Sequence, residues 1–176
     1  MYVSECQDPS ETQEFFRKKQ ITDPQSTKTA YVDYRRKSLE RGAARIRNLV
    51  PGGGRLLDVG TASGFFLRQF VDHPGWKTEG VEPSRVSADY ARRTFGVTVH
   101  DGFLAEQNFP ASCFDVVCSL DAFCCHRTPR EDMQEFFRIL APGGFLAIEI
   151  PGHRFRMLTG SGFLYRTMTG RSLRLN

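Results

Sequence analysis

Short apolar runs alternate with amphipathic segments along most of the chain after residue 54. Strands that alternate with helices are typical of a parallel sheet joined by crossover helices. The apolar runs predict strands at 55–59, 77–81, 97–100, 114–119 and 144–150, and the amphipathic segments predict helices at 63–72, 84–95 and 130–141. Two of the runs, 56–59 and 145–148, are almost continuously apolar, as strands covered on both faces are. We therefore expect an α/β fold with a doubly wound, mainly parallel sheet.

The first 50 residues carry a helical pattern instead. Residues 10–13 have the form of a capping box ahead of a short helix. Apolar residues at spacings of three to five predict a longer helix from about Gln25 to Leu49, which a Pro-Gly-Gly-Gly run ends. We expect 1–50 to form a helical cap or lid, 51–152 the α/β core and 153–176 the start of a substrate-lid segment. A chain of 176 residues is normal for one such domain.

The strongest local signal for chemistry follows the first strand. Asp58 stands at the strand's end and the turn Gly60-Thr61-Ala62-Ser63-Gly64 comes directly after it. Glycines in such a turn let a ligand approach backbone amides, although a tight turn also needs glycine for purely geometric reasons. Glu82 ends the next strand, about twenty residues later, where a carboxylate can accept both ribose hydroxyl hydrogens. The turn and the acid together predict a nucleoside site.

These residues resemble the class I S-adenosylmethionine-dependent methyltransferases, in particular the group that acts on small molecules, over about residues 51–152. The resemblance implies a Rossmann-like methyltransferase fold, S-adenosyl-L-methionine as cofactor and S-adenosyl-L-homocysteine as product. It implies that the glycine loop lies under the methionine part, that Glu82 holds the ribose and that Asp101 meets the adenine amine, with Phe103 beside the ring. The implied cofactor-binding residues are Asp58, Gly60, Thr61, Ala62, Gly64, Glu82, Pro83, Asp101, Gly102, Phe103, Ser119 and Leu120.

The chain departs from this family in two places. Ala62 stands where many relatives have glycine, and we expect it to be tolerated because the loop needs room more than it needs a positive φ. The family also completes its sheet with two more strands that form an antiparallel edge. Residues 153–176 are too few for a helix and both strands, so we expect the terminal antiparallel strands to be missing. Either the chain is truncated, which we favour, or a partner replaces the missing edge.

Methyl transfer needs a nucleophile placed in line with the methyl group, and a general base where the acceptor carries a proton. His126, after the fourth strand, is the first candidate base, and Asp121 is a candidate residue of the acceptor site. The plainer alternatives are an exposed loop histidine and a helix-capping aspartate. His153 is a second candidate base. Tyr31 and Tyr34 either close over the methionine part of the cofactor or pack in the core.

Composition narrows the class of protein. The formal net charge is +4, and the basic runs fall within helical patterns, which favours solvated helix faces over a nucleic-acid surface and leaves RNA open as a substrate. Five cysteines without a Cys-x-x-Cys pair indicate neither a disulfide framework nor a metal site. No apolar run approaches the roughly 18 residues of a membrane span, and no secretory signal is recognisable, so we expect a cytoplasmic protein.

Three functional hypotheses stay open at this point. The first is a methyltransferase with a small-molecule oxygen, nitrogen or carbon acceptor. The second is a non-catalytic binding domain that keeps the cofactor fold. The third is a nicotinamide-dependent oxidoreductase, whose Gly-x-Gly-x-x-Gly pattern this chain misses at two of three glycines. The sequence fixes neither the acceptor, the need for a base, nor the oligomeric state.

Overall fold

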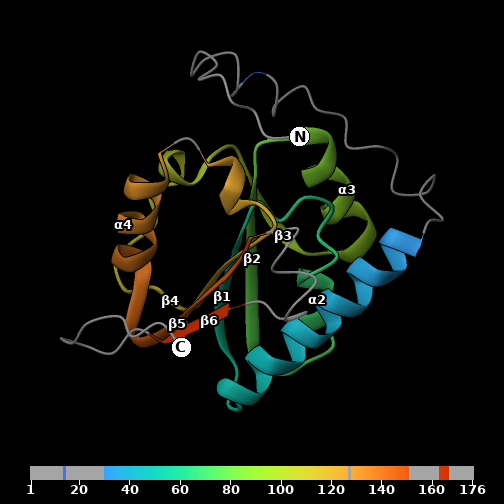
Figure 1. Cartoon of the computed structure of the whole chain (residues 1–176), viewed down its shortest axis with the longest axis horizontal. Helices are drawn as coiled ribbons and strands as arrows, with labels where there is room; N and C mark the ends of the chain where they lie inside the picture. Colours follow the sequence, from blue (N-terminus) through green and yellow to red (C-terminus); the bar gives the residue numbers. More distant parts are fainter. Residues whose placement is uncertain (1–13, 15–29, 127, 151–162, 167–176) are drawn as a thin grey trace.

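The computed structural model describes residues 14, 30–126, 128–150 and 163–166, and its elements are drawn in Figure 1. The strands are β1 (Gly54–Val59), β2 (Trp76–Glu82), β3 (Thr98–Asp101), β4 (Phe114–Leu120), β5 (Leu140–Glu149) and β6 (Phe163–Arg166). The helices are α2 (Ala30–Leu49), α3 (Arg85–Phe95) and α4 (Pro129–Ile139), with short 3-10 turns η1 (Leu67–Phe70), η2 (Leu104–Glu106) and η3 (Phe123–Cys125). The strands form one sheet in the order β3-β2-β1-β4-β5-β6.

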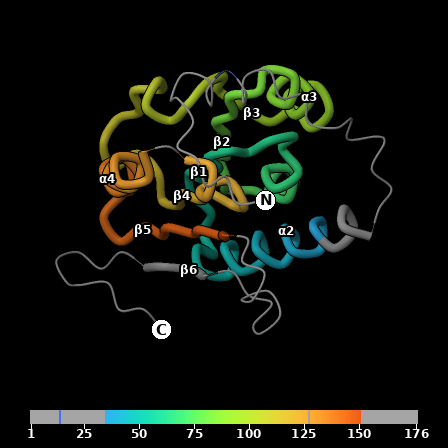
Figure 2. The backbone as a smooth tube through the Cα atoms, turned by 45° about the horizontal axis from the view of Figure 1, so that its top comes forward, coloured from blue at the N-terminus to red at the C-terminus, as the bar shows by residue number. Residues whose placement is uncertain are grey.

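Helices cover both faces of this sheet, which confirms the doubly wound α/β fold expected from the sequence. α2, η1 and α3 pack on one face, and α4 packs on the other (Figure 1, Figure 2). The pairs from β3 through β5 are parallel. The strand order reverses between β1 and β4, and open α/β sheets bind ligands outside the carboxyl ends of their strands at such a point. The topology therefore directs attention to the loops that follow β1 and β4.

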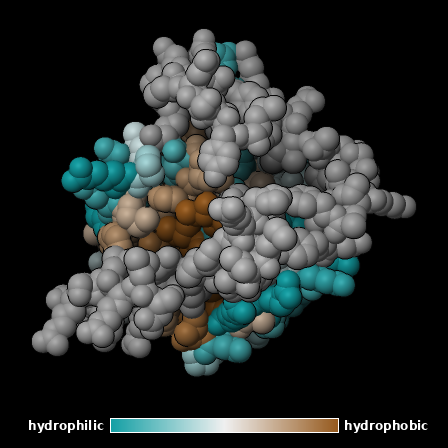
Figure 3. Space-filling view, viewed as in Figure 1, coloured by the Kyte–Doolittle hydropathy of each residue, from teal (hydrophilic) through white to brown (hydrophobic). Residues whose placement is uncertain are grey.

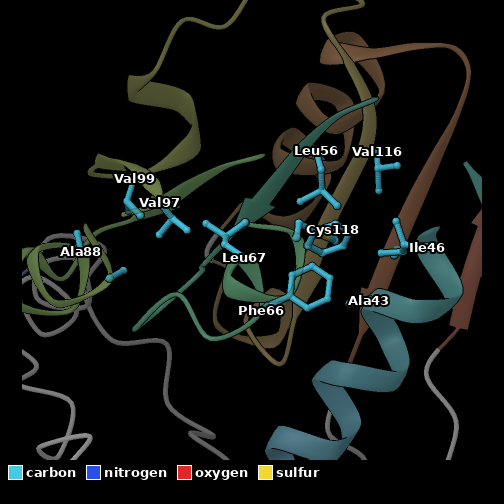
Figure 4. Packing of buried hydrophobic residues seen from close by; sticks show 13 residues of the cluster. Ala43, Ile46, Leu56, Phe66, Leu67, Ala88, Val97, Val99, Val116 and Cys118 are labelled. Carbon is cyan, nitrogen blue, oxygen red and sulfur yellow. The ribbon is translucent and has the colours of Figure 1, made fainter. Parts of the chain in front are cut away.

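Two apolar clusters hold the layers together, one on each face. Leu56 belongs to the cluster under α2 and α3, and its neighbour Leu57 belongs to the cluster under α4. This alternation explains why the β1 sequence is apolar at successive positions. Figure 4 shows Ala43 and Ile46 of α2 beside the sheet residue Val116, and both α2 residues are almost fully buried. α2 is thus part of the core packing, while the assignment of 1–50 as a cap or lid stays a prediction.

The outer side of α2 is polar. Figure 3 shows hydrophilic surface along α2 and hydrophobic surface in the middle of the same view, between α2 and the side occupied by α4. This distribution fits an amphipathic helix that turns Ala43 and Ile46 inward. Among the residues that the structure describes, no helix combines the length and the apolar character that a membrane crossing requires.

The predicted helix at 63–72 is wrong. In its place the chain makes turns and the short η1, in which Leu67 and Phe70 are both buried. Residues three apart lie on the same side of a 3-10 turn, so this geometry buries both side chains. A helix starting at 63 is also prevented by Gly64, whose φ of +77° lies in the left-handed region. The predicted helices 84–95 and 130–141 are confirmed to within two residues as α3 and α4.

The expectation about the antiparallel edge is wrong in one respect. β6 pairs antiparallel with β5, from Phe145↔Arg166 to Ile148↔Phe163, so an antiparallel edge strand is present. Four residues suffice to form it because their hydrogen-bond partners come from β5. A strand that pairs antiparallel with its neighbour needs no crossover helix. β5 itself begins at Leu140, earlier than the predicted 144, and its register with β4 shifts between Phe114 and Val116.

Candidate functional site

The loop after β1 adopts left-handed backbone at three positions. φ is +80° at Gly60, +50° at Ala62 and +77° at Gly64. A Cβ at Gly60 would collide with the Cβ of Ala122, and one at Gly64 would lie 2.6 Å from the Cβ of Ala91. Both glycines are therefore required by conformation and by space. At Ala62 the expectation that the loop needs room rather than a positive φ is wrong, because this residue also adopts the left-handed conformation.

The structure brings Glu82 against this loop, as the sequence predicts. Glu82 ends β2, and its carboxylate is buried with 6% of the residue exposed. Oε2 accepts a hydrogen bond from the Ala62 amide at 2.8 Å, and Oε1 accepts one from the Ser84 amide at 2.9 Å. The Gly102 amide donates to the Glu82 carbonyl at 3.0 Å. Glu82 thus joins the loop after β1 to the loop after β3.

Asp58 is a buried carboxyl under the same loop, with 2% of the residue exposed. Burial raises its pKa from 3.8 to about 7, and the nearby Glu82 carboxylate adds to the rise. Thr61, Cys118 and the Arg35 guanidinium act in the opposite direction. The Cys118 thiol donates to Oδ1 at 3.7 Å. The Thr61 hydroxyl lies close enough to lower the pKa but is outside hydrogen-bond geometry. Asp58 therefore exchanges a proton near neutral pH.

The end of β4 carries polar oxygen atoms that have no partner in the described part of the chain. Ser119 is fully buried, yet its hydroxyl makes no hydrogen bond. Asp121 has a φ of +59°, and its Oδ1 is buried without a partner. Since more than about nine in ten buried polar groups are normally paired, these two unpaired oxygen atoms are unusual and make the end of β4 a candidate for a functional role. Leu120, between them, is half-buried.

Arg35 is a site residue that sequence reasoning missed. Its Nε lies 2.9 Å from Asp121 Oδ2, and its Nη1 lies 2.9 Å from Glu149 Oε1. These ion pairs join α2 to the ends of β4 and β5. A signal for it exists, because Arg35 falls at helical spacing on the same stripe as Leu39 and Ala43. The sequence interpretation instead treated the basic run 35–37 as a solvated face.

His126 is more enclosed than the loop alternative assumed, with 13% of its side chain exposed. Its Nδ1 lies 3.1 Å from Asp132 Oδ2, and its ring packs against Phe123 and Phe136. Asp132 lies in the first turn of α4 and was not predicted. Nothing in the sequence distinguishes it from the other acidic residue of that turn, Glu131. A carboxylate that accepts from Nδ1 fixes the tautomer in which Nε2 is the basic nitrogen.

The residues after β3 are arranged in part as expected. Gly102 lies beside Glu82, to whose carbonyl its amide donates, and Phe103 follows Gly102 in the chain. The Asp101 carboxylate, however, faces Arg92 at 3.0 Å and is about half exposed. Its predicted contact with the adenine amine stays a prediction, as do the cofactor roles of Pro83 and Leu120. His153 lies outside the described residues, and so do the side chains of Tyr31 and Tyr34.

Comparison with known proteins identifies the family. The sequence profile of the methyltransferase domain matches residues 31–172. This chain belongs to that methyltransferase family. The family assignment favours the methyltransferase hypothesis over the nicotinamide-dependent oxidoreductase, and it implies S-adenosylmethionine as the cofactor.

Individual relatives agree with the assignment. A demethylmenaquinone methyltransferase of Chlorobaculum parvum is 30% identical over 91 residues, which are 51% of this chain and 38% of that protein. A solved SAM-dependent methyltransferase from Thermotoga maritima is 25% identical with a TM-score of 0.52, covering 67% of this chain and 55% of that one. The [4+2]-cyclase SpnF shares the fold at 24% identity and a TM-score of 0.56, covering 62% and 43%. The chain thus spans less than two thirds of the length of these relatives.

Proposed function

We propose that this chain binds S-adenosyl-L-methionine at the carboxyl end of its parallel sheet and directs methyl transfer to a small-molecule acceptor. The observation that carries the proposal is the meeting of Glu82, Asp58 and the left-handed loop after β1 at one edge of the sheet. The family assignment and the name of the Chlorobaculum relative support it.

The residues at this edge fit such a cofactor. The Ser119 hydroxyl and Asp121 Oδ1 are buried without protein partners in the described chain, so a ligand with polar groups would satisfy them. A Cβ at Gly60 would collide with Ala122, so the loop after β1 keeps its conformation only with glycine at this position. Glu82, Asp121 and, when ionised, Asp58 place carboxylates at this edge, which suits a ligand with a sulfonium and an ammonium group.

Each residue then has a role that its position allows. Glu82 would hold the ribose hydroxyls, and the amides of the loop 60–64 would lie under the methionine part. Asp58, once ionised, would attract the ammonium group from beneath the loop. The bound cofactor supplies an electrophilic methyl group, so that catalysis rests on placing the acceptor and excluding water.

A proton must leave when the acceptor is a hydroxyl or an ammonium group. His126 is the base that this arrangement supports best, because its Nδ1 is paired with Asp132 and its Nε2 is the nitrogen that accepts a proton. Asp121 lies five residues earlier in the same loop, and its Oδ1 would orient a donor group of the acceptor.

Calorimetry with S-adenosylhomocysteine tests the cofactor site. We expect one site per chain, and we expect Glu82→Gln to weaken binding by about 10-fold or more, since hydrogen bonds to a charged group are lost. Glu135→Gln is the matched control, because Glu135 lies on α4 and pairs with Arg138. Absence of binding to the wild-type chain would remove the proposal.

Transfer itself is tested with radiolabelled cofactor and candidate acceptors. Demethylmenaquinone is the first acceptor to try, since it stands in the name of the Chlorobaculum relative. Cofactor binding without transfer to any acceptor would favour the non-catalytic binding domain. Transfer that His126→Gln slows, with the pH profile losing the fall in rate on its acidic side, would support the histidine as base.

A further inference from the structure

Two adjacent thiols lie side by side in η3. The Sγ atoms of Cys124 and Cys125 are 3.9 Å apart, and both residues are exposed. The turn that carries them is fixed by hydrogen bonds from the Cys125 amide to Ala122 and from the His126 amide to Phe123. The Cys124 thiol also donates to the Asp121 carbonyl at 3.7 Å. The backbone thus fixes where the two side chains start, and their conformations bring both sulfur atoms to the same side of the turn.

Their separation suits a shared ligand atom rather than a disulfide. Two sulfur atoms bound to one atom at about 2.3 Å each lie at most about 4.6 Å apart, and the separation of Cys124 and Cys125 falls within this limit. A disulfide needs its two Cα atoms about 4.4–6.8 Å apart, whereas a trans peptide holds adjacent Cα atoms at about 3.8 Å. The peptide between Cys124 and Cys125 is trans. A thiophilic atom that bridges the two sulfurs is thus less strained than a direct sulfur–sulfur bond.

The kind of ligand follows from the number of donors. Within residues 30–126, 128–150 and 163–166, no three His, Cys, Asp or Glu side chains are grouped so that they could hold a metal ion. A tetrahedral zinc site of this chain's own residues is therefore not formed there. Two soft sulfur donors at a bent angle suit a thiophile that brings its third substituent with it. A trivalent organoarsenical has this composition, with one carbon and two sites for sulfur.

We propose that Cys124 and Cys125 form a dithiol binding site for trivalent arsenicals. In the reaction with an arsenoxide, both S–H bonds and the arsenic–oxygen bond break and two arsenic–sulfur bonds form. The oxygen leaves as water with the two thiol protons, and arsenic stays trivalent, so no oxidant or reductant is needed. This site goes beyond the proposed methyl transfer, and the binding experiment does not depend on it.

The protonation state of the Cys124 thiol distinguishes its reaction with an arsenoxide from its reaction with an alkylating reagent. Burial raises the pKa of Cys124 to about 11, and the neighbouring Cys125 thiol adds to the rise. At neutral pH the Cys124 thiol is therefore protonated, and alkylating reagents that need a thiolate react slowly with it. An arsenoxide takes up the protons in the water that it releases. Cys124 should thus react readily with arsenoxides and slowly with iodoacetamide.

The position of the turn gives the site a consequence for the rest of the molecule. η3 follows Asp121 directly and precedes His126, so an arsenical held there would lie at the edge where the acceptor is proposed to bind. An arsenical bound to the two thiols would then block the acceptor, while the loop 60–64 that is proposed to hold the cofactor stays free.

Intact-mass spectrometry of the full chain with phenylarsine oxide tests the proposal. In the presence of excess glutathione we expect one adduct per chain, with the mass of the reagent less one water, and we expect 2,3-dimercaptopropanol to remove it. Cys124→Ser and Cys125→Ser should each weaken binding about 100-fold or more, because a single thiol lacks the second, intramolecular bond. Cys113→Ser is the matched control and should bind as the wild-type chain does.

Folding of each variant is checked by circular dichroism, and both serine replacements fall on exposed positions that should tolerate them. An adduct that survives in Cys124→Ser and in Cys125→Ser would overturn the proposal, and so would a wild-type adduct that glutathione alone displaces. Binding of S-adenosylhomocysteine, measured in parallel, reports separately on the proposed cofactor site.

Discussion

Replacing Asp58 by asparagine should make the protein's stability less sensitive to pH. The pKa of this carboxyl is 3.8 ordinarily and about 7 in the fold, chiefly because the group is buried. A raised folded-state pKa means that the native chain binds more protons than the unfolded chain between these values. The contribution of Asp58 to the free energy of unfolding is therefore most favourable below about pH 4, and it is lost as the pH rises through about 7. At about 1.4 kcal/mol for each pH unit, the loss from this group is about 4 kcal/mol.

The assay is denaturant unfolding of wild-type and Asp58→Asn at several pH values from 4.5 to 8.5. Because other groups titrate in both proteins, the difference between their unfolding free energies isolates Asp58. We expect the free energy of unfolding of the variant, relative to that of the wild type, to rise steadily up to about pH 7. At pH 8 the variant should be the more stable protein. Asp72→Asn, at an exposed carboxylate that pairs with Arg68, should show no such trend. A difference for Asp58→Asn that is constant with pH would refute the reasoning.

Two further substitutions test the site's backbone and its ion pairs. Ala62→Gly should raise the unfolding free energy by about 1 kcal/mol, because glycine relieves the left-handed strain; the same change at Ala91, buried in α3, should lower it by about 1 kcal/mol or more. Equal effects at both positions would contradict this. Arg35→Gln should cost about 2 kcal/mol, because Asp121 and Glu149 lose their shared cation. Arg68→Gln, in an exposed pair, should cost less than about 1 kcal/mol by thermal or denaturant unfolding.

Much of the fold was predictable because burial on both faces leaves a mark in the sequence. Leu56 and Leu57 are buried on opposite faces, so the β1 run had to be apolar without alternation. The segment 63–72 failed for the opposite reason: its apolar residues fit a helix and a 3-10 turn alike, and the left-handed Gly64 decides between them. β6 could not be foreseen from four residues, since only the uncovered edge of β5 makes them a strand.

The site divides along the same line between local and long-range information. Parallel pairing sets Asp58 beside Gly80 and Glu82 beside Asp101. Acidic residues at the ends of these strands therefore lie at the same edge of the sheet. Contacts made by side chains from other layers follow no such rule. Arg35 reaches Glu149 across 114 residues, and only the way α2 packs on the sheet decides which strand ends it meets. A cationic residue on the inward-facing stripe of a helix can nevertheless be recognised in the sequence as unusual, because burying its charge without a partner would be costly. Such a residue implies carboxylates on the layer that it faces, and here that implication leads from α2 to Asp121 at the proposed acceptor edge.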